Sequence, residues 1–176
     1  TQLREILGPD FNGSALVSRD GDVLFAEGVG MADASNSVPN APETRFRLGS
    51  ITKQFTAAAI LRLVEQRRIS LDADVRQYLP ELRTVGARIT ILQLLNHTSG
   101  IHSYTSSPAW AKTWNDALSP DAIVKFVAAD TFDFAPGTAY RYNNTGYVLL
   151  GMVIEKASGQ KYANYLDAQF FKPLGL

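Results

Sequence analysis

Residues 49–66 read Gly-Ser-Ile-Thr-Lys-Gln-Phe-Thr-Ala-Ala-Ala-Ile-Leu-Arg-Leu-Val-Glu-Gln. From Ile51 onward this stretch predicts a helix that is apolar over most of its circumference, and such a helix is typical of a protein core. Ser50 and Lys53 stand three residues apart at its start. Their side chains are therefore expected on one face of the helix, one turn apart.

The pair Ser50 and Lys53 has the residue types of a nucleophile and a nearby base. The positive end of the helix disfavours the protonated ammonium of Lys53 and favours negative charge on Ser50, by about 1 kcal/mol. Burial and a neighbouring group must supply most of the activation. The same spacing recurs at Ser158 and Lys161. There it crosses an expected helix end, and we interpret it as a polar helix terminus followed by a surface Lys.

The sequence before the helix predicts strands. Two apolar runs surround Asp20-Gly21, and this pattern predicts an antiparallel hairpin over residues 13–30. The polar stretch 35–44, which contains Pro39 and Pro42, predicts an irregular loop.

The sequence after the helix predicts further helices, a turn and a short extended piece. The helices are expected at residues 72–80 capped by Asp72, 91–96 capped by Thr90, from Ser119 onward, 147–157 ending at Ser158-Gly159, and about 162–171 ending before Pro173. A turn is expected at 135–137 and a β-like piece at 138–142. No repeat or linker is visible, so residues 1–176 are predicted to form one domain, with no internal boundary.

Charge and composition narrow the classes of function. The chain has 17 basic and 17 acidic side chains and a formal net charge of zero, which argues against nucleic-acid or membrane-surface binding. It has no Cys and only two His, so a thiolate nucleophile is excluded and a metal centre is not expected. No residue pattern implies a metal or an organic cofactor, and no apolar run is long enough for a membrane span.

Three longer segments carry a resemblance to a known family. They are residues 46–56 (Phe-Arg-Leu-Gly-Ser-Ile-Thr-Lys-Gln-Phe-Thr), 94–101 (Leu-Leu-Asn-His-Thr-Ser-Gly-Ile) and 140–151 (Tyr-Arg-Tyr-Asn-Asn-Thr-Gly-Tyr-Val-Leu-Leu-Gly). In this order and at these separations they resemble the penicillin-recognising serine hydrolases, in particular the branch of class C β-lactamases, D-alanyl-D-alanine carboxypeptidases and related esterases. Residues 171–176 look like the segment that follows, so the resemblance covers nearly the whole chain.

The resemblance implies an α+β fold of the β-lactamase/transpeptidase type. This chain would hold the N-terminal portion of that fold, namely a hairpin of the antiparallel sheet and the helical region with Ser-x-x-Lys and Tyr-x-Asn. The C-terminal strands of the sheet would be absent from this chain. A periplasmic or secreted location fits the family and the absence of Cys.

The resemblance also implies roles for four residues. Ser50 would be the acylated nucleophile, and Lys53 would help to remove its proton. Tyr142, in the Tyr-x-Asn element at 142–144, would be the second acid/base group, and Asn144 would hydrogen-bond the amide of the substrate. The backbone N–H of Ser50 would donate one hydrogen bond to the oxyanion.

Other residues suggest alternatives. His97 could belong to a Ser-His-Asp triad, but no Gly-x-Ser-x-Gly elbow is present and the family uses no His base, so we expect His97 to hold a loop at a helix end. A second Tyr-x-Asn match at 162–164 is interpreted as helix packing. Tyr104, Trp110 and Trp114 either line a substrate pocket or pack in the interior.

One motif of the family is missing. The sequence contains no Lys-Thr-Gly, Lys-Ser-Gly or His-x-Gly. The strand that carries this motif in the family supplies the other oxyanion donor, and the loss of one such donor costs about 10²- to 10³-fold in rate. Three explanations stay open: a longer gene product, a second polypeptide that completes the domain, or a truncated protein that folds differently or pairs with itself. In this chain alone, the two-stranded hairpin has an unpaired edge, and the apolar faces meant for the missing strands are expected to be exposed.

Two functions from different classes follow. The first is a serine hydrolase that forms an acyl-serine on an amide, β-lactam or ester of a small molecule or peptide. The second is a non-catalytic, penicillin-binding-like sensor or binding module, or an inactive fragment that needs a second polypeptide. The presence of Ser50, Lys53, Tyr142 and Asn144 favours the first function, and the missing motif favours the second.

Overall fold

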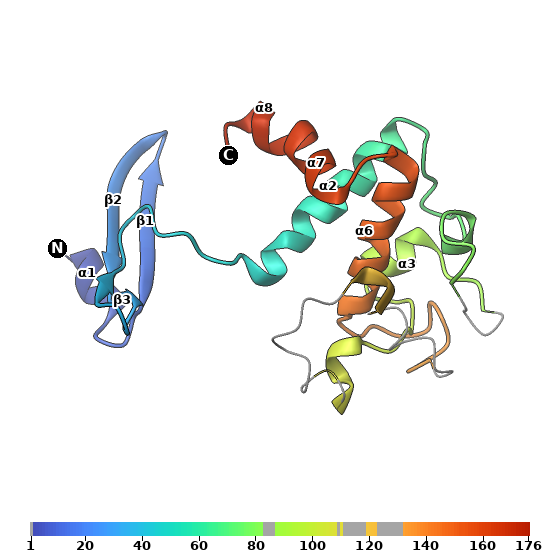
Figure 1. Cartoon of the computed structure of the whole chain (residues 1–176), viewed down its shortest axis with the longest axis horizontal. Helices are drawn as coiled ribbons and strands as arrows, with labels where there is room; N and C mark the ends of the chain where they lie inside the picture. Colours follow the sequence, from blue (N-terminus) through green and yellow to red (C-terminus); the bar gives the residue numbers. More distant parts are fainter. Residues whose placement is uncertain (1, 83–86, 109, 111–118, 123–131) are drawn as a thin grey trace. The chain divides into compact units, whose positions relative to one another are not determined.

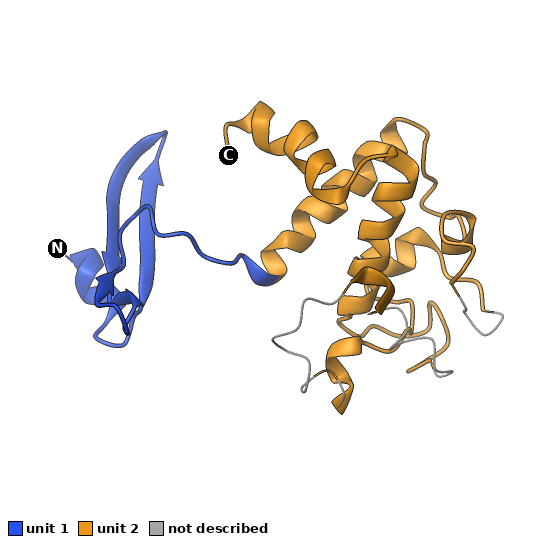
Figure 2. Cartoon of the chain, in the orientation of Figure 1, with its two compact units in different colours: residues 1–49 blue, residues 50–176 orange. Residues whose placement is uncertain are grey.

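The computed structural model describes residues 2–82, 87–108, 110, 119–122 and 132–176. They fall into two compact units, residues 1–49 and residues 50–176 (Figure 2). The first unit contains two small antiparallel sheets and the second unit is mainly helical (Figure 1), so the chain is α+β, as predicted. That residues 1–176 form one domain stays a prediction.

The first unit is built on the predicted hairpin. Its elements are α1 (Gln2–Leu7), β1 (Gly13–Arg19), β2 (Asp22–Val29), β3 (Met31–Asp33) and β4 (Val38–Pro39). β1 pairs with β2 antiparallel, and the hairpin over residues 13–30 is confirmed. Asp20 and Gly21 both have positive φ, 54° and 90°, as a type I′ turn requires.

The hairpin leaves apolar side chains exposed. Leu16, Val23 and Leu24 are each more than half exposed. Among the residues that the structure describes, β1 and β2 pair only with each other. The expectation of an exposed apolar hairpin is therefore confirmed.

The stretch 35–44 is not wholly irregular, and that prediction is wrong for Val38–Pro39. These residues form β4, which pairs with β3 in a second two-stranded sheet. The connection is closed by the carboxylate of Asp33, which accepts backbone N–H groups from Ser35 at 2.9 Å and Asn36 at 3.2 Å. Such Asx turns are a local device that Pro content alone does not reveal.

The second unit is a cluster of helices around one core. The turn η1 (Gly49–Ile51) leads into it from the last residue of the first unit. Its other elements are α2 (Thr52–Glu65), η2 (Val75–Gln77), α3 (Ile91–Leu95), η3 (Tyr104–Ser106), α6 (Asn144–Ser158), α7 (Tyr162–Leu166), the π-helical turn η4 (Asp167–Phe171) and α8 (Lys172–Leu174). α6 contacts α2, α3 and α7 (Figure 1). Ile60 and Leu63 of α2 and Leu149 and Val153 of α6 are fully buried, which confirms the predicted core helix.

The start of α3 could be predicted from the sequence because its cap is formed by neighbouring residues. The side chain of Thr90 accepts the N–H of Gln93 at 3.1 Å, and the side chain of Gln93 accepts the N–H of Thr90 at 2.9 Å. This capping box confirms Thr90 as the helix cap. The cap predicted at Asp72 is wrong, because Asp74 accepts the N–H of Arg76 and begins only the short turn η2.

The extended piece predicted at 138–142 is not a strand. The N–H of Arg141 donates to the carbonyl of His97 at 3.0 Å instead of pairing with a strand. α6 begins at Asn144, earlier than predicted, because the side chain of Asn143 caps it by accepting the N–H of Gly146 at 2.7 Å. The predicted turn at 135–137 is confirmed by the bond from the N–H of Thr138 to the carbonyl of Ala135.

Of the two predicted helix C-termini that the structure describes next, one is confirmed and the other is wrong. α6 ends at Ser158 with Gly159 in the left-handed conformation, as predicted. The last helix does not end before Pro173, because Pro173 lies in the first turn of α8, where a missing N–H removes no helical hydrogen bond. Ser119 caps residues 120–122 by accepting the N–H of Ala122 at 3.1 Å, and the rest of that predicted helix lies outside the described residues.

A stability test follows from Gly100. Its φ is +70°, and a Cβ there would stand 2.0 Å from the carbonyl oxygen of Phe134. Gly159 has almost the same φ, +72°, but open space around it. We expect Gly159→Ala to lower the free energy of unfolding by about 1 kcal/mol, and Gly100→Ala by about 3 kcal/mol because of the additional clash. Urea denaturation of both variants measures the difference, and equal losses would mean that the Phe134 segment moves aside without cost.

Candidate active site

The predicted nucleophile lies where the chain enters the long helix α2. Gly49, just before it, has a φ of +54°, a conformation that glycine adopts without strain. Ser50 is exposed and lies in the first helical turn, where backbone N–H groups have no partner within the helix. One turn on, Nζ of Lys53 stands 3.4 Å from Oγ of Ser50. The expectation that both side chains share one face is confirmed.

Tyr142 reaches the same place from a distant part of the sequence. Its Oη lies 2.6 Å from Oγ of Ser50, although the two residues are 92 positions apart. Tyr142 stands in the irregular stretch that precedes α6 and is 44% exposed. Among the described residues, the phenol thus lies closer to the Ser50 hydroxyl than the ammonium of Lys53 does.

Asn144 completes the group at the first residue of α6. Its Oδ1 accepts from Nζ of Lys53 at 2.8 Å, and its Nδ2 donates to Oγ1 of Thr105 at 3.1 Å. The N–H of Asn144 also donates to Oγ of Ser103 at 3.3 Å. The amide is therefore held on both sides, and it orients Lys53. The structure brings all four predicted residues together, while their roles in the reaction stay predictions.

The ammonium group of Lys53 contacts side chains that are not ion-pair partners. Its Nζ lies 4.7 Å from the ring centroid of Tyr142 and 5.4 Å from that of Tyr147, which are cation–π distances. No ion pair within the described part of the chain includes Lys53. Its positive charge is therefore available to stabilise negative charge on a neighbouring oxygen.

The tyrosines around Lys53 differ in their acidity. Burial raises the pKa of the Tyr142 phenol, but hydrogen bonds with Lys53 and Ser50 and the charge of Lys53 outweigh it, and the net pKa lies below its ordinary value. For Tyr104 and Tyr147, burial and then the charge of Tyr142 raise the pKa. Of these three phenols, Tyr142 is the one that the site prepares to lose its proton.

His97 holds the loop, as expected. Its Nδ1 accepts the N–H of Asn143 at 3.1 Å, and its carbonyl accepts the N–H of Arg141. Sequence reasoning missed Tyr147, whose ring faces Lys53, and Thr105, which holds Asn144. Tyr147 stands three residues after Asn144, so helical periodicity could have placed both on one face. Nothing in the sequence pointed to Thr105.

The second Ser-x-x-Lys match does not form a Ser–Lys pair. Oγ of Ser158 accepts the N–H of Gln160 at 3.1 Å, which completes the helix terminus. Lys161 is highly exposed, and its Nζ lies 3.9 Å from a carboxylate oxygen of Glu155. The interpretation as a helix end followed by a surface Lys is confirmed.

The aromatic candidates pack against neighbours. Oη of Tyr162 lies 2.7 Å from Oγ1 of Thr56, so the second Tyr-x-Asn match joins α7 to α2, as interpreted. The rings of Tyr104 and Trp110 meet edge to face at 4.6 Å. Whether they also line a substrate pocket stays open, and Trp114 lies outside the described residues.

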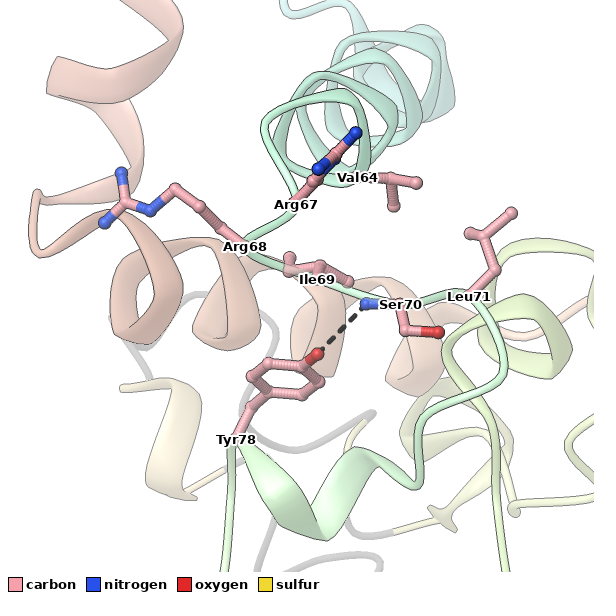
Figure 3. A pocket seen from close by; sticks show the side chains of 7 residues that line it. All are labelled: Val64, Arg67, Arg68, Ile69, Ser70, Leu71 and Tyr78. Atoms are coloured by element: carbon pink, nitrogen blue, oxygen red, sulfur yellow. Dashed lines mark hydrogen bonds between the residues drawn. The ribbon is translucent and has the colours of Figure 1, made fainter.

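A pocket of about 470 Å³ lies at the other end of α2 (Figure 3). Its lining residues are Val64, Arg67, Arg68, Ile69, Ser70, Leu71 and Tyr78. The N–H of Ser70 donates to Oη of Tyr78 at 3.1 Å. The pocket contains none of the predicted site residues and no Lys, so it is distinct from the candidate active site.

In the described part of the chain, no group of three or more His, Asp or Glu side chains is arranged to hold a metal ion. None of the helices described has both the length and the apolar character needed to cross a membrane.

Comparison with known proteins relates the whole chain to one family. Residues 10–176 match the sequence family described as Beta-lactamase. Penicillin-binding protein 4* of Bacillus subtilis is 36% identical, over 99% of this chain and 39% of its own length. Esterase EstB of Burkholderia gladioli is 35% identical, over 92% of this chain and 45% of its own length.

A solved structure agrees with the sequence relatives. The D-amino acid amidase from Ochrobactrum anthropi SV3, complexed with D-phenylalanine, superposes with a TM-score of 0.79 and 31% sequence identity. The match covers 93% of this chain and 45% of the amidase. The chain therefore spans less than half the length of these proteins and corresponds to the N-terminal portion of their fold.

Proposed function

Because the chain belongs to the beta-lactamase family, we propose that it carries the nucleophile of a serine hydrolase that forms an acyl-serine on an amide, β-lactam or ester. The family includes esterases, D-amino acid amidases and penicillin-binding proteins. The observation that carries the proposal is the 2.6 Å contact between Oγ of Ser50 and Oη of Tyr142, with Lys53 beside both.

In the first step the Tyr142 phenolate accepts the hydroxyl proton of Ser50 while Oγ bonds to the substrate carbonyl carbon. The carbonyl π electrons move to its oxygen, and a tetrahedral oxyanion forms. The backbone N–H of Ser50, at the start of the helix, donates a hydrogen bond to that oxyanion. The charge of Lys53 stabilises the phenolate before the step.

In the second step the intermediate collapses. The carbonyl re-forms, the bond to the leaving group breaks, and the Tyr142 phenol gives its proton to the departing amine or alkoxide. An acyl group remains on Ser50, Tyr142 is again a phenolate, and water then hydrolyses the ester. One phenol can thus serve as base and acid because it lies next to the nucleophile and has a lowered pKa.

Covalent labelling tests this proposal. We expect a serine-reactive phosphonate to add one equivalent to the protein, measured by denaturing intact-mass spectrometry, and peptide mapping to locate the adduct on Ser50. No adduct, or an adduct on another side chain, would contradict it. A panel of a β-lactam, a D-amino-acid amide and a short-chain ester then identifies the leaving group that the site accepts.

A second candidate is a binding module that is acylated slowly or not at all. A stoichiometric adduct without turnover of any of the three substrates would support this candidate over the hydrolase.

A further inference from the structure

The backbone on both sides of Tyr142 is bound to a single residue. The N–H of Arg141 donates to the carbonyl oxygen of His97 at 3.0 Å, and the N–H of Asn143 donates to its Nδ1 at 3.1 Å. His97 has a φ of +63°, in the left-handed region that side-chain-bearing residues seldom adopt. In this conformation its carbonyl and its ring both meet residues 141–143.

The ring of His97 also supports the phenol itself. Its centroid lies 4.8 Å from that of Tyr142, with the planes tilted by 40°, and 5.2 Å from that of Tyr147. Tyr140 meets the same ring edge to face at 5.9 Å. Both the main chain and the aromatic ring of Tyr142 are therefore held by His97.

We propose that His97 is a positioning residue, which holds Oη of Tyr142 on Ser50 through its carbonyl and through Nδ1 as an unprotonated acceptor. The consequence for acylation rests on the proposed function, whereas the placement of Tyr142 does not. None of the contacts of the described residues joins His97 to Ser50, so His97 acts only through Tyr142. The proposal gives the imidazole a defined role without a Ser-His-Asp triad.

We call the contacts of His97 with residues 141–143 the clamp. Because Nδ1 acts in it as a hydrogen-bond acceptor, the clamp is sensitive to pH. Nδ1 accepts the N–H of Asn143 only through its lone pair. A proton on Nδ1 would make it a donor facing another N–H donor, and the hydrogen bond to Asn143 would be lost. The charged and titratable groups that face the ring are the ammonium of Lys53 and the phenols of Tyr140, Tyr142 and Tyr147. The guanidinium of Arg141 is paired with the carboxylate of Asp133 at 3.1 Å.

These surroundings keep His97 neutral. Burial, and then the charge of Lys53, hold the pKa of His97 below its ordinary value of 6.5. The clamp is consequently intact at neutral pH and is lost as the pH falls through that lowered pKa. Acylation, which needs Tyr142 in place, should fall with it.

Two substitutions at His97 separate the acceptor from the backbone conformation. Asn and Gly both tolerate a φ of +63°, and both remove the ring, but only Asn offers an oxygen near the position of Nδ1. We expect His97→Gly to slow phosphonate labelling about 100-fold through misplacement of the phenol, and His97→Asn to stay within about tenfold of the parent.

The position of Tyr142 can be read without any reaction. In protein labelled with ¹³C at Cζ of tyrosine, NMR titration gives the pKa of Tyr142, with its signal assigned by Tyr142→Phe. We expect His97→Gly to raise this pKa towards the ordinary value, because the phenol leaves Lys53 and Ser50, and His97→Asn to preserve it. In the parent protein the signal should also shift at acid pH as His97 protonates, and His97→Asn should lack that step.

The outcomes discriminate between the proposals. Parental labelling and an unchanged Tyr142 pKa in His97→Gly would overturn the clamp, as would equal losses in both variants. If His97→Gly does not fold by urea denaturation, the acid step, present in the parent and absent from His97→Asn, decides the question. If the parent protein is never labelled, the proposed function fails, while the Tyr142 titration still tests the clamp.

Discussion

We expect Ser50→Ala to abolish labelling by a serine-reactive phosphonate. The variant lacks the only hydroxyl that lies 2.6 Å from Oη of Tyr142 and 3.4 Å from Nζ of Lys53 among the contacts of the described residues. We expect the intact mass of the treated variant to equal that of the untreated variant, against a full equivalent of adduct on the parent.

The matched control is Ser158→Ala. Ser158 belongs to the other Ser-x-x-Lys match, but its Oγ completes a helix terminus by accepting from Gln160. Its replacement should leave the labelling rate unchanged. Loss of labelling in Ser158→Ala together with normal labelling in Ser50→Ala would show that the nucleophile lies at the other copy of the spacing.

Tyr142→Phe is expected to slow acylation by about 10²- to 10⁴-fold, the usual contribution of a positioned acid/base group. The change removes one oxygen from a side chain that is 44% exposed, so the fold should be retained. In the parent protein the labelling rate should rise with pH through the pKa of Tyr142, which lies below its ordinary value. The base works only as the phenolate, so the variant should lose this rise.

Tyr140→Phe is the control for this experiment. Tyr140 is 68% exposed and lies two residues before Tyr142, so its phenol should make no difference to the rate. The rates follow from time courses of intact-mass labelling at several pH values. Parental rates in Tyr142→Phe would exclude the phenol as the base and would direct attention to Lys53.

The elements that could be predicted from sequence are those with local chemistry. The turn at Asp20-Gly21 needs two positive φ values, and Asp and Gly tolerate them. The capping box of Thr90 and Gln93 closes within four residues, and Gly159 ends α6 by its own conformation. The pair of Ser50 and Lys53 belongs to the same class, because a spacing of three places two side chains together on any helix.

The predictions that failed concern segments with distant partners. Residues 138–142 have the composition of a strand, yet the N–H of Arg141 bonds to the carbonyl of His97, 44 positions earlier. Asp74, and not Asp72, is the cap, and the N–H of the next residue, Val75, donates to the carbonyl of Ile89, 14 positions later. Hydrogen bonds of this kind join segments that only the packed core brings together, so no window of sequence contains them.

By itself the sequence determined the local geometry of Ser50 and Lys53 and, by resemblance, the α+β class and the four residues of the candidate site. The tertiary structure decided which group lies nearer to the nucleophile. With α6 packed on α2, Oη of Tyr142 lies 2.6 Å from Oγ of Ser50, whereas Nζ of Lys53 lies 3.4 Å from it. It also decided that Asn144 holds Lys53 and that His97 holds both neighbours of Tyr142. The physical reason is that helical spacing acts over one turn, whereas a contact across 92 residues exists only once the core has been buried.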